Sequence, residues 1–206
     1  MTPAATPAAG RLAPVRFESL PPYAPTTYLD FSQPAERAAF EKALAEVKAQ
    51  FGKTYPLVIN GERVDGGEKP FTTTNPARPG EVLGTFQSGS RAQAELAVEA
   101  AANAFASWSR VPAAERAAYL VEAAKRMRER RNTFSAWMVF EVGKSWAEAD
   151  ADTGEAIDFM EFYAREMLRY DQPVPLTQLP GETDTQVYLP LGVGAVIPPW
   201  NFPLAI

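Results

Sequence analysis

The sequence predicts an α/β fold, and three observations support this class. Between Tyr55 and Phe86 short apolar runs alternate with turn residues, which is typical of strands, and from Ser90 to Tyr170 apolar residues follow the 3.6-residue period of helices. Residues 192–197 are then continuously apolar, as expected for a strand buried on both faces of a parallel sheet. Helices that precede such a strand indicate an α/β protein.

Length and composition narrow the classes of function. With 206 residues, 46% of them hydrophobic, the chain suits one large globular domain or parts of two. No run is long enough to span a membrane, and a net charge of −5 argues against nucleic-acid binding. The chain contains no Cys and no His, which excludes disulfides, Cys or His metal sites and a thiol nucleophile within it. No secretory signal is visible, so we expect a cytoplasmic protein.

The N-terminal part is expected to change from a tail to a helix. Residues 1–14 are rich in Ala, Pro and Thr, and we expect residues 1–30 to form a disordered tail. Residues 31–170 are expected to form the helical and β-hairpin part that follows. Its first helix begins near Pro34, because Pro fits the first helical turn, and ends near Phe51.

Turn residues then mark a small β-region. Asn60-Gly61 stands between two short apolar runs and predicts a tight β-hairpin. Residues 75–80, rich in Pro and Gly, predict a further turn, and residues 81–86 predict the strand after it.

Two capping boxes mark the starts of helices in the middle of the chain. Ser90 with Gln93 introduces one helix, and Ser145 with Glu148 introduces a long one that ends near Tyr170. The long helix is expected to present an apolar stripe, made of Ala156, Phe159, Met160, Tyr163 and Met167.

Two more helices are expected between these. Pro112 opens the first, and Asn132 or Thr133 caps the second, which Gly143 ends in the left-handed conformation. Lys144 follows directly. A Lys here can bind phosphate, but we favour a cation that complements the helix macrodipole.

Residues 171–191 predict an extended flap. They carry prolines at 173, 175, 180 and 190, and these fit an edge or an inter-subunit arm better than a central sheet. We therefore expect a homo-oligomer that forms through this flap. Residues 192–206 follow as the first strand of a larger sheet and the turn after it.

The turn after this strand is the strongest candidate for a site. Pro198 and Pro199 lack an N–H and must end the strand, so Trp200, Asn201 and Phe202 stand at its carboxyl end. In open α/β sheets ligands bind at this edge. The alternative is an aromatic plug that closes the sheet, with Asn201 shaping the turn.

Several motifs together resemble the aldehyde dehydrogenase family. They are the hairpin at Gly61, Glu141-Val-Gly-Lys144 and the string Gly192-Val-Gly-Ala-Val-Ile-Pro-Pro-Trp-Asn-Phe-Pro203, and the resemblance covers residues 30–206. It implies the N-terminal portion of a Rossmann-type NAD-binding domain, less than half of a usual member. The helical segment Glu155–Ala164 and the string Pro180-Gly-Glu are most similar to the dehydrogenases of L-glutamate γ-semialdehyde (1-pyrroline-5-carboxylate), which implies a role in proline degradation.

The resemblance also implies roles for single residues. In this family a cysteine thiolate attacks the aldehyde, hydride passes to NAD and the thioester is hydrolysed. Asn201 matches the amide of the oxyanion hole. Ile197, Pro198, Pro199 and Trp200 match the side that binds the ribose and nicotinamide, and Phe202 matches a residue facing the aldehyde. Glu155 matches a carboxylate near the substrate's amino group, but it is equally well interpreted as a solvated helix residue.

The chain departs from the family pattern in its missing parts. It has no catalytic cysteine, no glutamate base, no ribose-binding lysine and no phosphate-facing glycine loop, so we expect a truncated polypeptide that is inactive by itself. The choice between NAD and NADP stays open. Two alternatives remain: a dehydrogenase for another small aldehyde such as succinate semialdehyde, and a non-catalytic assembly module whose 171–191 flap serves oligomerisation only.

Overall fold

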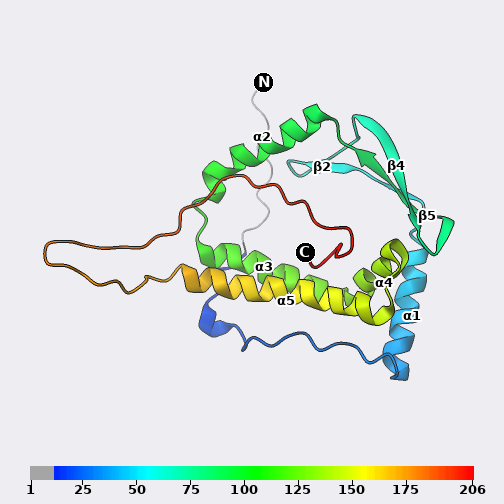
Figure 1. Ribbon diagram of the computed structural model, residues 1–206, viewed down its shortest axis with the longest axis horizontal. Helices are drawn as coiled ribbons and strands as arrows, with labels where there is room; N and C mark the ends of the chain where they lie inside the picture. The colour runs from blue at the N-terminus through cyan, green and yellow to red at the C-terminus, as the bar shows by residue number, and fades with distance from the viewer. Residues whose placement is uncertain (1–11) are drawn as a thin grey trace.

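The computed structural model describes residues 12–206, in which two small sheets adjoin one end of a layer of packed helices, and the helix of residues 91–108 lies apart from that layer (Figure 1). The helices are η1 (Phe17–Ser19, a single 3-10 turn), α1 (Pro34–Lys48), α2 (Arg91–Trp108), α3 (Ala113–Glu129), α4 (Arg131–Val142) and α5 (Trp146–Tyr170). The strands are β1 (Lys53–Tyr55), β2 (Leu57–Ile59), β3 (Glu62–Val64), β4 (Glu68–Asn75) and β5 (Arg78–Ser88). No described helix has both the length and the apolar character needed to cross a membrane.

Local capping chemistry sets most helix boundaries. The hydroxyls of Ser90 and Ser145 accept hydrogen bonds from the N–H groups three residues later, so both predicted capping boxes are confirmed. Gly143 ends α4 with φ of 70°, also as predicted. The predicted cap of α4 at Asn132 or Thr133 is wrong. Arg130 both ends α3 and precedes α4, so these two residues lie inside the helix.

The predicted hairpin is confirmed, and the larger sheet adds an unexpected pairing. Asn60 and Gly61 have φ values of 53° and 80°, as a type I′ turn requires, and β2 pairs antiparallel with β3. β4 and β5 pair antiparallel around the short turn after Asn75. β1 adds to β5 in parallel, giving the order β1-β5-β4, which local sequence signals do not predict.

The helices pack through small residues. α3 and α5 lie side by side, with Ala117, Ala164 and Leu168 buried between them (Figure 1). Alanine allows the two helix backbones to approach closely. The predicted stripe on α5 is only partly right: Ala156 is buried, but Tyr163 is 56% exposed. Neighbouring helices bury small residues of α5 such as Ala156 and Ala164, whereas the aromatic side chains of Phe162 and Tyr163 are exposed.

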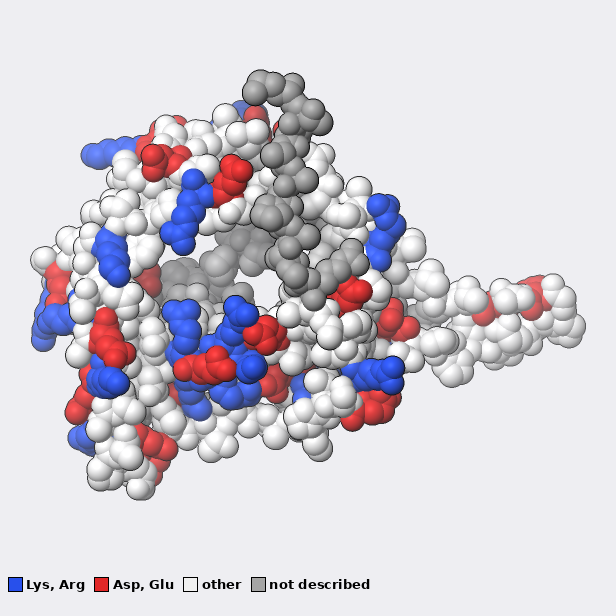
Figure 2. Space-filling model, turned by 180° about the vertical axis from the view of Figure 1, so that it is seen from behind, with Lys and Arg blue, Asp and Glu red and all other residues white. Residues whose placement is uncertain are grey.

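Residues 171–197 form extended chain without strands. The flap, residues 171–191, projects from the helical layer and has few charged atoms (Figures 1 and 2). The predicted strand at residues 192–197 is wrong for this structure. Ile197 is 90% exposed, because no described strand lies beside this segment to share its backbone hydrogen bonds.

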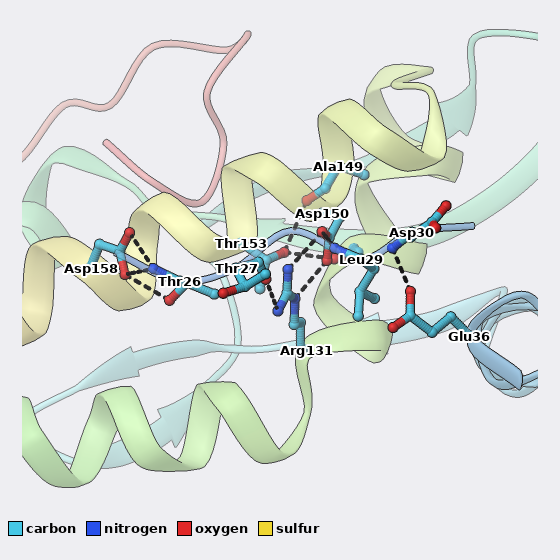
Figure 3. A network of polar contacts seen from close by, with 11 residues as sticks. Thr26, Thr27, Leu29, Asp30, Glu36, Arg131, Ala149, Asp150, Thr153 and Asp158 are labelled. Atoms are coloured by element: carbon cyan, nitrogen blue, oxygen red, sulfur yellow. Dashed lines mark hydrogen bonds and ion pairs between the residues drawn. The ribbon is translucent and has the colours of Figure 1, made fainter. Parts of the chain in front are cut away.

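The expectation of a disordered tail over residues 1–30 is also wrong where the structure describes it; residues 1–11 lie outside the described residues. Residues 15–30, which we call the strap, run along α5 (Figures 1 and 3). The Thr26 N–H donates to Asp158 Oδ1 at 2.9 Å, and the Leu29 N–H donates to Asp150 Oδ2 at 2.8 Å. Carboxylates on α5 thus satisfy backbone groups of a segment whose composition alone predicts disorder.

Candidate active site

An open pocket of about 690 Å³ lies between α5, the end of α4 and the turn formed by residues 200–206. Trp200, Asn201 and Phe202 reach it from the turn, and Glu155 reaches it from α5. The structure therefore brings together these four residues, which the sequence analysis singled out separately. The other lining residues are Tyr28, Val142, Gly143, Lys144, Glu148, Ala151, Asp152 and Asp158.

Asp152 joins the turn to the helical layer. Its Oδ1 accepts the Ala205 N–H at 2.8 Å, and its Oδ2 accepts a hydrogen bond from Lys144 Nζ at 2.5 Å. The side chain of Asp152 is 1% exposed. The Lys144 ammonium also lies 4.8 Å from the centre of the Phe202 ring, a cation–π contact.

Sequence reasoning missed Asp152 and did not predict the ion pair of Lys144. Lys144 does follow the end of α4, as expected for a cation that complements the helix macrodipole, and its ammonium is held by a carboxylate of α5. The left-handed Gly143 turns the chain so that α5 starts beside this ammonium. No local sequence signal marks Asp152, because its role follows only from its contact with Ala205.

Two glutamates of α5 line the pocket, and they differ in the hydrogen bonds that their carboxylates accept. The Ser145 N–H and hydroxyl donate to Glu148 at 3.0 and 2.8 Å, and these hydrogen bonds hold the pKa of Glu148 below its ordinary value. Glu155 is half-buried and has no hydrogen-bond or ion-pair partner in the described part of the chain. Its carboxylate is therefore free to meet a ligand cation.

Ile197, Pro198 and Pro199 lie outside this pocket. Ile197 and Pro198 are exposed and Pro199 is half-buried. No described group donates a hydrogen bond to the carbonyls of these three residues. Such carbonyls fit the hydroxyl groups of a ribose, which need acceptors, so the segment is chemically suited to the cofactor side predicted for it.

The fold agrees with the comparison to known families. The model of the Aldehyde dehydrogenase family matches residues 63–206. The chain belongs to this family, and the predicted fold class, an incomplete N-terminal portion of the aldehyde dehydrogenase fold, is confirmed.

Relatives within the family share a more particular name. The chain is 49% identical over 185 residues to 1-pyrroline-5-carboxylate dehydrogenase of Geobacillus thermodenitrificans, covering 90% of this chain and 36% of the relative. It is also 49% identical to 1-pyrroline-5-carboxylate dehydrogenase 2 of Bacillus subtilis, with the same two shares covered. The chain thus spans about a third of the length of these relatives.

Two solved structures are also similar to this chain in fold and sequence. Thermus 1-pyrroline-5-carboxylate dehydrogenase with bound NAD is similar with a TM-score of 0.87 and 45% identity, over 91% of this chain and 36% of that one. Proline utilization A from Bdellovibrio bacteriovorus is similar with a TM-score of 0.86 and 43% identity, over 89% of this chain and 19% of that one.

Proposed function

We propose that this chain acts as part of an NAD-dependent dehydrogenase that oxidises L-glutamate γ-semialdehyde (1-pyrroline-5-carboxylate) to L-glutamate in proline degradation. The observation that carries the proposal is the pocket that unites the Asn201 amide, the Phe202 ring and the Glu155 carboxylate. The named relatives support the same substrate.

The side chains of Asn201 and Phe202 are suited to a reaction in which a nucleophile adds to the carbonyl group of an aldehyde. When a nucleophile adds to the carbonyl carbon, the oxygen becomes negative and needs fixed hydrogen-bond donors. The neutral NH₂ group of Asn201 donates without transferring a proton to that oxygen. Phe202 would contact the apolar part of the substrate. The attacking thiolate comes from outside these 206 residues, which contain no Cys.

The segment that precedes Asn201 would hold the cofactor. The carbonyls of residues 197–199 and the indole of Trp200, which is 84% exposed, are available to a dinucleotide. When bound, NAD supplies the hydride acceptor for the oxidation. Residues that distinguish NAD from NADP are not evident in this segment, so NADP remains an alternative cofactor.

Glu155 is proposed to select the substrate through its amino group. A half-buried carboxylate without an internal partner can form a charge-assisted hydrogen bond to an ammonium group. Glutamate semialdehyde carries such a group, and succinate semialdehyde does not. This difference separates the proposed substrate from the alternative one.

The activity can be tested in a chimera in which this chain replaces the matching 36% of the Geobacillus thermodenitrificans relative. We expect the chimera to oxidise glutamate semialdehyde with a higher kcat/KM than succinate semialdehyde. A preference for succinate semialdehyde would support the alternative dehydrogenase. If the chimera is active and substitutions at Asn201 and Glu155 both leave its kcat and KM unchanged, the result would support the alternative that this chain is a non-catalytic assembly module.

Substituting Glu155 by Gln should weaken this selection. We expect kcat/KM for glutamate semialdehyde to fall by roughly 5-fold to 150-fold relative to glutarate semialdehyde, the matching aldehyde without an amino group, because about 1–3 kcal/mol of charge-assisted binding is lost. The control is Glu148→Gln, which removes a carboxylate already engaged by Ser145 and should affect both substrates alike. Equal losses for Glu155→Gln would assign Glu155 to structure.

The flap is proposed to join subunits of a homo-oligomer. Val187 and Leu189 are 70% and 76% exposed, while Tyr188 between them packs against Tyr170 of α5, with ring centroids 5.0 Å apart. The flap contains no Lys or Arg, and its projecting part is largely uncharged (Figure 2). An exposed apolar arm of extended chain is suited to bury against a second copy.

Charges placed on this arm should therefore weaken assembly. We expect the double substitution Val187→Asp and Leu189→Asp in the chimera to shift sedimentation to a smaller species, because two carboxylates would have to be buried at the contact. Thr183→Asp, near the tip of the same flap, serves as the control and should leave the sedimentation coefficient nearly unchanged. An unaltered assembly in the double variant would contradict the proposed contact.

A further inference from the structure

The turn at residues 200–206 depends on few anchors. Within the described chain, its one hydrogen bond to the helical layer runs from the Ala205 N–H to Asp152 Oδ1, at 2.8 Å. The Phe202 ring of the turn also lies beside Lys144 Nζ, which is itself bound to Asp152. Both anchors therefore converge on one carboxylate.

That carboxylate is buried and fully engaged. Asp152 is 3% exposed as a residue, and each of its oxygens accepts a hydrogen bond from a different segment of the chain. A buried charge is tolerated only when it is paired and hydrogen-bonded. Lys144 supplies the opposite charge, and Ala205 supplies the second donor, so the carboxylate couples the end of α4 to the turn.

Helix geometry places this anchor beside the proposed substrate contact. Asp152 and Glu155 are three residues apart on α5, so both lie on one face of the helix. Asn201 and Phe202 stand between the anchored Ala205 and the two prolines, Pro198 and Pro199, that follow the extended segment. The position of the Asn201 amide relative to Glu155 thus depends on the bond at Asp152.

We propose that Asp152 is a positioning residue for the aldehyde dehydrogenase reaction: together with Lys144 it fixes the turn that carries Asn201 and Phe202. Asp152 acts through the turn and does not itself contact the reacting atoms. This inference rests on the proposed function, because the turn matters for the reaction only if Asn201 stabilises the oxyanion.

The anchor itself can be tested in the 206-residue chain by amide hydrogen exchange, observed by NMR. Asp152→Ala, which removes both acceptors, should speed exchange of the Ala205 amide roughly 10-fold to 100-fold. Asp152→Asn keeps the shape of the side chain but not its charge, and it should cause a smaller increase. The Leu168 amide, within the helical layer, should exchange as slowly as before.

A matched control uses the second carboxylate of α5 that holds a distant segment. Asp158→Asn should speed exchange of the Thr26 amide, which donates to Asp158, and leave Ala205 unchanged. The Asp152 variants should show the opposite pattern. Unchanged exchange of Ala205 in both Asp152 variants would overturn the anchor, and faster exchange throughout the chain would instead assign Asp152 to general stability.

The positioning role is tested by kinetics of the chimera. We expect Asp152→Asn to lower kcat about 10-fold to 100-fold, the effect of a misplaced catalytic group, with a smaller change in the KM for the aldehyde. In an Asn201→Ala background the same substitution should lower kcat little further, because the amide that it positions is already absent. If the two substitutions instead lower kcat independently, so that their fold-losses multiply in the double variant, positioning through Asn201 is overturned. If Asn201→Ala alone left kcat unchanged, the oxyanion role would fail, whereas the exchange data would still decide whether Asp152 holds the turn.

Discussion

Replacing Asn201 by Ala is expected to lower kcat of the chimera by roughly 10²–10³, the usual effect of removing one oxyanion donor. Asn201 lies at the pocket, two residues after Pro199, with which the extended segment ends. Its NH₂ group is needed most when negative charge develops, so the loss should appear in the transition state rather than in cofactor binding. The dissociation constant of NAD should therefore change little.

The measurement is the rate of NADH formation in a single turnover, with enzyme in excess over aldehyde. This rate reports the steps up to hydride transfer and excludes later hydrolysis and product release. The aromatic-plug interpretation of Asn201 predicts a different result, in which thermal stability falls and the single-turnover rate does not. Measuring Tm and rate on the same variant separates the two roles.

Signals that act over a few residues could be predicted from the sequence. The Ser90 and Ser145 capping boxes, the Asn60-Gly61 hairpin and the left-handed Gly143 each depend on the chemistry of a short segment. These features form wherever the local groups can satisfy one another, and tertiary contacts need only preserve them.

Features that depend on distant partners could not be predicted in this way. Thr26 and Asp158 are 132 residues apart in sequence, and the local composition of the strap does not predict the hydrogen bond between them. The extended state of residues 192–197 has the same cause, because an apolar run becomes a strand only beside a partner.

The residues of the candidate site show the same difference between local sequence signals and distant contacts. Asn201, Phe202 and Glu155 were found through motifs, and the structure places them at one pocket. Asp152 and Tyr28 belong to no motif and were missed. Asp152 is recognisable only from its contact with Ala205, and Tyr28 only from the path of the strap across α5.

The strap depends on a buried ion pair with a large expected effect on stability. Arg131 Nε and Nη2 each lie 2.6 Å from an oxygen of Asp150, whose side chain is 1% exposed (Figure 3). Arg131 Nη1 also donates to the Thr27 carbonyl at 2.9 Å, and Asp150 accepts the Leu29 N–H. The pair therefore links α4, α5 and the strap in one network.

Arg131→Met should lower the free energy of unfolding of the 206-residue chain by about 3–5 kcal/mol, because it leaves a buried carboxylate without its counter-charge. Urea unfolding followed by circular dichroism measures this change. The control is Arg169→Met, which breaks a pair whose arginine side chain is 56% exposed. That change should remain within about 1 kcal/mol of the unsubstituted chain.

A second substitution tests the cause of this loss. Adding Asp150→Leu to Arg131→Met removes the unpaired charge, so the double variant should recover part of the lost stability. It should not restore the strap, since the Leu29 N–H and the Thr27 carbonyl would still lack their partners. Limited proteolysis should then cut the strap faster than in the unsubstituted chain, although the helices are again stable. A double variant less stable than Arg131→Met would show that Asp150 stabilises the fold mainly through the strap backbone rather than through its pairing with Arg131.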